Sequence, residues 1–264
     1  MPTPMIRMMR AILCLLCFAP TTLLAASCPP DSVKVGTTCI DIYEASVWRV
    51  PAGRSALLRK IRKGTVTLAD LTDGGATQLG AAKLDGCGDE YGPGFPSSGN
   101  WTEPVYAVSV PGVLPSTCVT WFQAEQACAL AEKRLPTNQE WQRAAAGTPD
   151  PGFDDGLTSC NLGNTFGPVP TGSRAACVSS WGVFDMAGNV AEAVGDWDEQ
   201  ATSCGSWMFG DTYCSGGPGD AGGIGSPARG GYWDFGFPNG GIFHYNASIS
   251  PAAGYANHGF RCAR

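Results

Sequence analysis

The chain has 264 residues, with 17 Lys and Arg against 23 Asp and Glu, and its net charge is −6. This acidic balance argues against nucleic acid as a partner, because binding to phosphates relies on clustered positive charge. The 36 Gly and 20 Pro predict one large domain that is rich in turns and long enough to bury a sizeable core.

The N-terminal residues predict a signal peptide over 1–27. Two arginines precede an uncharged apolar run over 11–26, and small residues follow it. The run is shorter than the roughly 20 residues that cross a bilayer, and no later stretch is long and apolar enough for a second span. We therefore expect a mature domain over 28–264 that is secreted, periplasmic or located at the cell surface.

The cysteine count agrees with export. Cys14 and Cys17 lie in the predicted signal peptide, so ten of the 12 cysteines remain, and five disulfides in an oxidising compartment account for all of them. The alternative is a lipid anchor on Cys28, because residues 24–28 are similar to a lipoprotein processing site. That anchor would leave an odd number of cysteines. A zinc cluster is disfavoured, since the mature cysteines have no CxxC spacing and the chain has only two histidines.

The first part of the mature chain predicts little regular structure. Residues 28–39 predict a disulfide-closed loop that leads into a strand over 40–45, where apolar and polar residues alternate. Residues 49–63 carry six basic residues, which predict a solvated helix face, with a partner site as the alternative. Residues 64–115 are dense in Gly, Pro, Thr and Asp and predict loops, apart from a short strand over 105–110.

Two helices are predicted between residues 120 and 147. Each begins with a capping box, at 120–123 and at 137–140. Pro136 separates them because proline cannot continue a helix, and Gly147 provides a C-cap for the second. In the first helix, residues at helical spacing face a core: Trp121, Ala124, Cys128 and Ala131.

Short motifs occur in a characteristic order from residue 41 to the C-terminus. They are Asp41–Glu44, Val119–Trp121, Lys133–Thr137 with Glu140–Trp141, Asp185–Val190 with Glu192, Asp196–Trp197, Arg229–Gly231 and Gly259–Cys262. Together they resemble the formylglycine-generating-enzyme, or sulfatase-modifying-factor, family. The resemblance implies an α+β fold, an irregular and loop-rich variant of the C-type lectin fold, with two main helices, short antiparallel strands and several disulfides. Residues 49–100 match least and are predicted to be an insertion.

The resemblance implies one disulfide, between the first predicted helix and the terminal Gly-Phe-Arg-Cys motif. Sequence proximity then pairs the other cysteines. The predicted disulfides are Cys128 with Cys262, Cys28 with Cys39, Cys160 with Cys177, Cys204 with Cys214, and Cys87 with Cys118.

A structural calcium site is also implied by the resemblance, with Asp185, Gly188, Val190 and Glu192 as ligands. Calcium prefers carboxylate and carbonyl oxygens, and a turn at Gly188 brings such groups together. The alternative is that Asp185 caps a turn while Glu192 is solvated.

The residues that carry the family's catalysis differ in this chain. The family enzyme oxidises a sulfatase cysteine to formylglycine with oxygen and a copper ion, which two thiolates hold shortly after the Arg-Gly-Gly motif. Phe235 and Gly240 stand at about these positions, and residues 232–244 contain no cysteine. We therefore expect no copper and a non-catalytic binding or scaffold domain. The alternatives are a divergent oxidoreductase that acts on sulfatase cysteine, or a modulator of such an enzyme.

A recognition surface is predicted in the C-terminal region. Residues 232–255 are dense in aromatic and polar side chains interrupted by Gly and Pro, and rigid aromatics give contact area at a low cost in entropy. The ligand is an unknown protein or glycan. The predicted contact residues are Phe237, Asn239, Phe243, His244 and Tyr245, and the alternative is that these aromatics fill the core.

Overall fold

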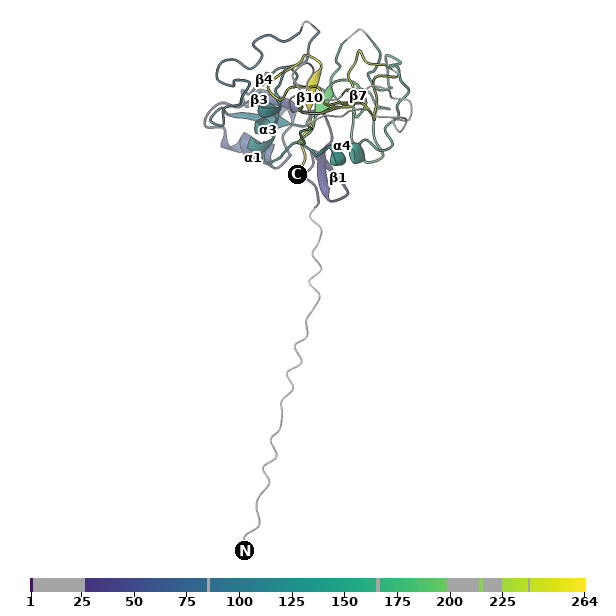
Figure 1. Cartoon of the computed structure of the whole chain (residues 1–264). Coiled ribbons are helices and arrows are strands. Elements are labelled where there is room, and N and C mark those ends of the chain that lie inside the picture. Colours follow the sequence, from purple (N-terminus) through teal and green to yellow (C-terminus); the bar gives the residue numbers. More distant parts are fainter. Residues whose placement is uncertain (2–26, 85, 165–166, 199–213, 216–224, 237) are drawn as a thin grey trace.

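The structure is a computed structural model, which describes Met1 and residues 27–264 except for 85, 165–166, 199–213, 216–224 and 237 (Figure 1). In the described part the helices are α1 (Ser55–Arg62), α2 (Leu68–Asp73), α3 (Trp121–Leu130) and α4 (Asn138–Ala144). The strands are β1 (Ser32–Val35), β2 (Thr38–Asp41), β3 (Ser46–Arg49), β4 (Thr77–Leu79), β5 (Val105–Val108), β6 (Ala191–Ala193), β7 (Cys214–Ser215), β8 (Ala228–Arg229), β9 (Tyr245–Asn246) and β10 (His258–Phe260).

A three-stranded antiparallel sheet, in the order β4-β3-β5, is covered by helices on both faces. Val47 and Ala107 point to one face and pack in the same cluster as residues of α3. Trp48 and Tyr106 alternate with them and pack on the other face against α1 and α2. β3 and β5 are therefore almost wholly buried, which explains why apolar residues occupy successive positions in them, whereas the edge strand β4 is partly exposed.

The second sheet, in the order β10-β6-β8-β9-β7, is built from strands in the C-terminal half of the chain. Its edge strand β10 lies near the centre of the molecule (Figure 1). The last residues continue from β10 and bond to the antiparallel β1–β2 hairpin, since the Cys39 and Arg264 backbones exchange hydrogen bonds of 2.9 and 2.8 Å. The β1–β2 hairpin and the C-terminal residues are thus joined.

The capping boxes at Thr120 and Thr137 both form, so the two predicted helices are present. The core residues of α3 lie where the spacing predicts, with Ala124, Cys128 and Ala131 buried and Trp121 half-buried. α4 is shorter than predicted. It ends at Ala144, and Gly147 has a φ of +79° in the turn that follows.

Residues 49–100 contain more regular structure than predicted. The basic segment forms α1, but the stretch predicted as loops also contains α2 and β4. Thr67 and Asp70 form a capping box at the start of α2, and Leu71 anchors it in the core beneath. The residue at the third position of a capping box is usually glutamate or glutamine, but here it is Asp70. The start of α2 was therefore not recognised in a stretch that is rich in Thr and Asp.

The part of the chain that the structure describes contains four disulfides, and each joins the partners that were predicted. They are Cys28–Cys39, Cys87–Cys118, Cys128–Cys262 and Cys160–Cys177. The fifth predicted pair lies outside the described residues, because neither Cys204 nor the side chain of Cys214 is described. Four disulfides indicate an oxidising, extracellular type of environment.

The described helices are all short. None of them has the length and apolar character needed to cross a membrane.

Candidate functional site

A cleft of about 430 Å³ lies in the C-terminal region. Small-ligand sites usually have volumes of about 300 to 1,000 Å³, so the cleft is large enough for one. One wall is formed by Tyr232, Trp233 and Asp234, which follow β8. Tyr255, Ala256 and Asn257, which precede β10, form the other wall, and Leu84 from the N-terminal half lines its edge. The rings of Tyr232 and Trp233 contact each other at 5.7 Å, and the Asp234 side chain is exposed.

Glycines fold the first wall. Gly231 has a φ of +73°, and a Cβ there would lie 2.9 Å from the Cα of Gly240, so neither position tolerates a side chain. The close approach brings Gly231 and Gly240 together at the two ends of a tight loop. A hydrogen bond of 3.1 Å from Gly241 N to Gly230 O closes it.

His258 lies directly behind the cleft. Its ring is 5.2 Å from that of Tyr255 and 6.1 Å from that of Tyr232. Although the residue as a whole is half-buried, both ring nitrogens are shielded from solvent and have no hydrogen-bond partner within the described part of the chain. Burial, reinforced by His244 nearby, lowers the pKa of His258 to about 3, so the imidazole is neutral at pH 7.

His244 is buried rather than exposed, unlike the surface position predicted for it. Its Nδ1 lies 2.7 Å from the carbonyl oxygen of Asn239, and its ring is 5.8 Å from that of Phe235. Burial lowers its pKa to about 4. A neutral imidazole with a carbonyl partner is stable inside the protein, which explains how a polar side chain comes to fill the core here.

The other predicted contact residues are spread out. Asn239 is exposed and Phe243 half-buried, while Phe237 lies outside the described residues. Tyr245 donates a hydrogen bond to Asp198 and lines a different cavity, of about 390 Å³, beside Trp197. Residues 232–255 thus contribute Tyr232, Trp233, Asp234 and Tyr255 to the cleft of about 430 Å³. None of these is among the five predicted contact residues.

Comparison with known proteins identifies the family. The model of the sulfatase-modifying factor enzyme 1-like domain matches residues 96–264, which is more than half of the chain. The chain belongs to this family. The expected loop-rich α+β variant of the C-type lectin fold is therefore confirmed by the family match and by the short strands and helices of the described part.

Two relatives with a known name match this chain over fewer residues than the family model does. Hercynine oxygenase of Mycolicibacterium smegmatis is 37% identical over 93 residues, which are 31% of this chain and 22% of that protein. Hercynine oxygenase of Mycobacterium tuberculosis is 36% identical over 93 residues, with coverage of 31% and 22%. The match thus spans about a fifth of the length of these relatives.

Two solved structures are similar at low sequence identity. Major Tropism Determinant I1 Variant has a TM-score of 0.48 and 18% identity, and the match covers 89% of this chain and 52% of that one. PvdO from Pseudomonas aeruginosa has a TM-score of 0.41 and 18% identity, with coverage of 86% and 93%.

The positions of the family's copper thiolates lie in the tight loop beside the cleft. Phe235 and Gly240 occupy them, and neither carries sulfur. The eight cysteines whose side chains are described are all in disulfides. These residues do not fit a copper ion held by a thiolate pair.

The segment predicted to bind calcium is buried below the cleft. Asp185, at a φ of +58°, accepts hydrogen bonds from Thr171 Oγ1 at 2.9 Å and Gly172 N at 2.7 Å. Glu192 accepts one from Trp141 Nε1 at 2.7 Å, and both of its oxygens bond to Arg261. A calcium ion bound by Glu192 would have to compete with Arg261, whose positive charge lies against both oxygens, so the arrangement as it stands does not favour calcium there.

Buried charge is nevertheless concentrated around that segment. Glu44, fully buried, bonds to Val190 N at 3.1 Å and to the amide of Asn189. Burial, together with Asp185 and Glu192 nearby, raises the pKa of Glu44 well above its usual value. Burial likewise raises the pKa of Asp185 to about 6. Among the described residues, no group of three or more His, Cys, Asp or Glu is placed to hold a metal ion.

Proposed function

We propose that this chain is an exported, non-catalytic binding domain of the sulfatase-modifying-factor family, and that the cleft between Tyr232 and Tyr255 is its ligand site. The observation that carries the proposal is the pairing of aromatic walls with accessible polar side chains. Tyr255 and Asp234 are exposed at the cleft, and Tyr232, Trp233 and Asn257 line it beside them.

The chemistry of the cleft favours a glycan as ligand. Tyrosine rings offer flat apolar faces on which a sugar ring stacks. Asp234 is an acceptor of hydrogen bonds, and the Asn257 amide is both donor and acceptor, which suits hydroxyl groups. A volume of about 430 Å³ is within the usual range for small-ligand sites.

Export is supported by the disulfides and by the predicted signal peptide. Cleavage after residue 27 gives a mature chain that begins with Cys28, and mass spectrometry of protein recovered from the export compartment tests this. A mature chain that retains residues 11–26 would contradict it.

Binding is tested with a glycan array and titration calorimetry on the disulfide-bonded domain. We expect Tyr255→Ala and Asp234→Asn each to weaken binding about tenfold or more, since each removes one specific contact. Trp101→Ala is the matched control, because Trp101 is exposed but is not among the cleft residues. Equal loss in all three variants, or binding to peptides in place of glycans, would contradict the proposal.

An oxidoreductase is the second candidate function, and the two histidines behind the cleft favour it. Both imidazoles are neutral at pH 7 and lie close to the loop in which the family places its metal. The likeness to hercynine oxygenase points in the same direction. Incubation with copper, oxygen and a peptide with the sulfatase cysteine motif, followed by mass spectrometry, separates the candidates, because conversion of the cysteine would exclude the non-catalytic function.

A further inference from the structure

The positive charge of the mature domain is concentrated in one segment. Residues 49–79 contain six basic and two acidic residues and so carry four net positive charges, whereas the chain as a whole has a net charge of −6. No acidic residue occurs between Glu44 and Asp70. This segment also precedes the part that the family model matches, which begins at residue 96.

Half of these basic side chains have internal partners and half do not. Arg49 pairs with Glu103 and Lys60 with Asp70, both at 2.5 Å, and Arg62 lies 3.5 Å from Glu132. Arg54, Arg59 and Lys63 are exposed and form no ion pair within the described part of the chain.

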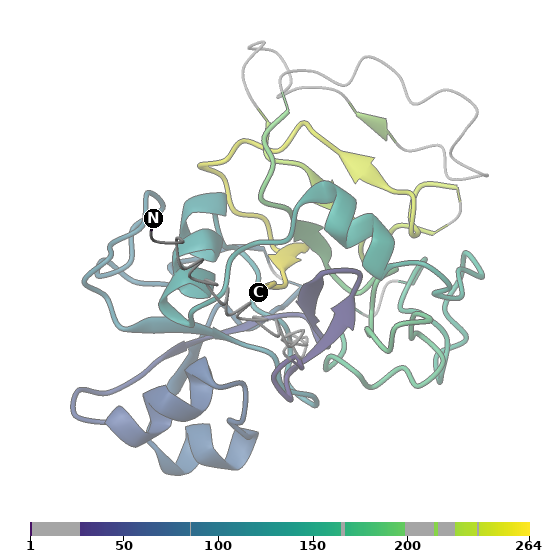
Figure 2. The ribbon, with the colours of Figure 1, turned by 90° about the horizontal axis from the view of Figure 1, so that it is seen from below.

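The helix that carries them is firmly anchored. Leu57 and Ile61 are buried and pack in one cluster with Trp48 and Tyr106 of the sheet beneath. Arg59 and Lys63 are four residues apart, so they lie on the same outward face of α1. Figure 2 places α1 and α2 at one edge of the molecule, apart from the C-terminal loops.

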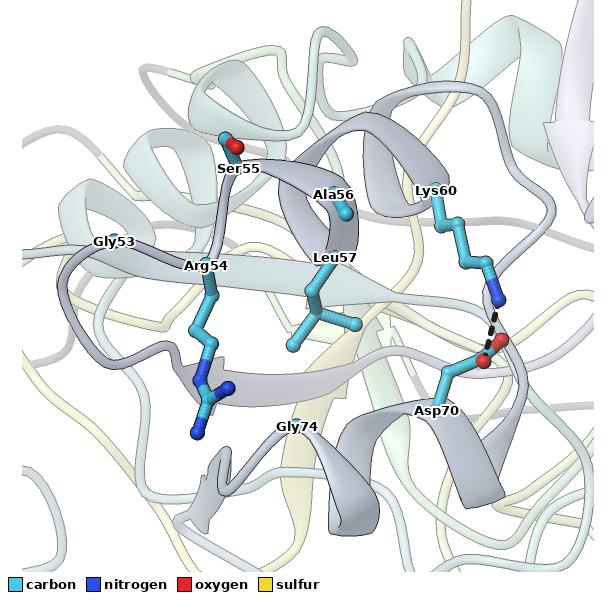
Figure 3. A pocket seen from close by; sticks show the side chains of 8 residues that line it. All are labelled: Gly53, Arg54, Ser55, Ala56, Leu57, Lys60, Asp70 and Gly74. Carbon is cyan, nitrogen blue, oxygen red and sulfur yellow. Dashed lines mark hydrogen bonds and ion pairs between the residues drawn. The ribbon is translucent and has the colours of Figure 1, made fainter.

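A cleft of about 330 Å³ lies between α1 and α2, beside this face. Figure 3 shows the Arg54 guanidinium on one side of it and the Lys60–Asp70 pair on the other, with Leu57 between them. The cleft therefore combines an unpaired cation, a neutralised ion pair and an apolar side chain.

We propose that the outer face of α1, with this cleft, is a docking surface for an acidic segment of another protein. Three unpaired cations on a rigid helix attract a chain of opposite charge and orient it. A peptide supplies both carboxylates for Arg54, Arg59 and Lys63 and an apolar side chain for Leu57. A uniformly charged polysaccharide would face Asp70 and gain nothing from Leu57. A membrane requires apolar side chains that protrude and insert, whereas Leu57 and Ile61 of α1 are buried and only the part of Leu57 that lines the cleft can be contacted.

The surface is separate from the cleft at Tyr232, so it is tested independently of the ligand site. The probe is a short fluorescent peptide of Glu, Asp and Leu, titrated with the complete disulfide-bonded domain at low and at high salt. The test variant is Arg59→Ala with Lys63→Ala, and a second is Arg54→Ala. The matched control is Lys34→Ala with Arg143→Ala, which removes two exposed cations elsewhere on the molecule.

We expect the test double variant to raise the Kd of the peptide about five- to tenfold and the control to change it less than about twofold, because exposed ion pairs act only at short range. Arg54→Ala should weaken binding as well, and high salt should weaken it for the unmodified domain. Equal losses in both double variants would show general attraction between charges and overturn the proposal. So would the absence of peptide binding, or tighter binding to heparin or to vesicles of anionic lipid.

Discussion

Arg261 donates hydrogen bonds to both carboxylate oxygens of Glu192, and both side chains are buried. The same guanidinium also donates to the carbonyl oxygens of Asp41 at 3.1 Å and Phe184 at 2.9 Å. One residue of the terminal motif thus joins β2, β6 and the loop before Asp185. The motif that identifies the family from its sequence is therefore also a structural centre of the domain.

Loss of one partner of this pair should strongly destabilise the domain. We expect Glu192→Gln to lower the free energy of unfolding by about 3–5 kcal/mol, since it leaves the Arg261 charge buried without its counter-ion. Urea denaturation measures this. The control is Glu132→Gln, which removes the exposed partner of Arg62 and should cost less than about 1 kcal/mol. A similar loss of unfolding free energy in the two variants would show that burial of the Glu192–Arg261 pair does not make it more important than an exposed ion pair.

Calcium should have little effect on stability, because Arg261 already occupies the oxygens of Glu192. We expect the thermal midpoint of the domain to be the same, within about 1 °C, in calcium and in a chelator, since a ligand stabilises only the state that binds it. A clearly higher midpoint with calcium would mean that Glu192 exchanges its arginine for the ion, and would restore the site implied by the family resemblance.

The long disulfide should stabilise the domain more than the short one. Cys128 and Cys262 are 134 residues apart, and Cys28 and Cys39 are 11 apart. On a chain-entropy basis, their removal by paired Cys→Ala changes should cost about 5 and about 3 kcal/mol respectively. Urea denaturation of the two variants measures the difference. The reverse order would show that strain or residual structure outweighs the entropy of loop closure.

His258 should make stability dependent on pH. Its pKa is about 3 in the folded domain, against an ordinary value of 6.5, so between these values the unfolded chain binds a proton that the folded domain does not. The stabilising contribution of the neutral ring is complete above pH 6.5 and is lost as the pH falls towards 3. Replacement by Gln should flatten the curve of unfolding free energy by up to about 1.4 kcal/mol per pH unit in this range.

The raised pKa values of Asp41 and Asp185, both about 6, give slopes of the opposite sign. These slopes are present in the unmodified domain and in His258→Gln alike, so the difference between the two curves isolates the histidine. Urea denaturation at a series of pH values gives both curves. Parallel curves would mean that the ring of His258 remains accessible to protons in the folded state.

The sequence was most informative where the signal is local. The helices α3 and α4 were predicted because Thr120 and Thr137 each begin a capping box within four residues. The start of α2 uses the same device, but Asp70 in place of Glu or Gln concealed it. The family motifs identified the fold because their order extends over most of the chain.

The candidate site was predicted only in part, because its walls come from separate segments. Asp234 and Asn257 are brought together by the fold rather than by a pattern in the sequence. His244 was included in the predicted recognition surface because residues 232–255 are dense in aromatic and polar side chains, with a place in the core as the alternative. In the structure it is buried, and its Nδ1 lies within hydrogen-bond distance of the carbonyl oxygen of Asn239. The absence of thiols at Phe235 and Gly240, in contrast, is evident from the sequence alone.

The hydrogen bonds between the β2 segment and the C-terminal residues also determine when folding of the domain can be completed. Ala45 N and Asp41 N bond to the carbonyl oxygens of Phe260 and Cys262, at 2.8 and 2.9 Å, and Cys262 is covalently joined to α3. A growing chain that lacks its final residues can still pair β2 with β1, but it lacks the bonds that Asp41 and Ala45 make to the C-terminal segment and leaves Cys128 as a free thiol. Such a chain is exposed to incorrect disulfide exchange until synthesis ends, so premature termination within the last few residues should yield protein that fails to mature.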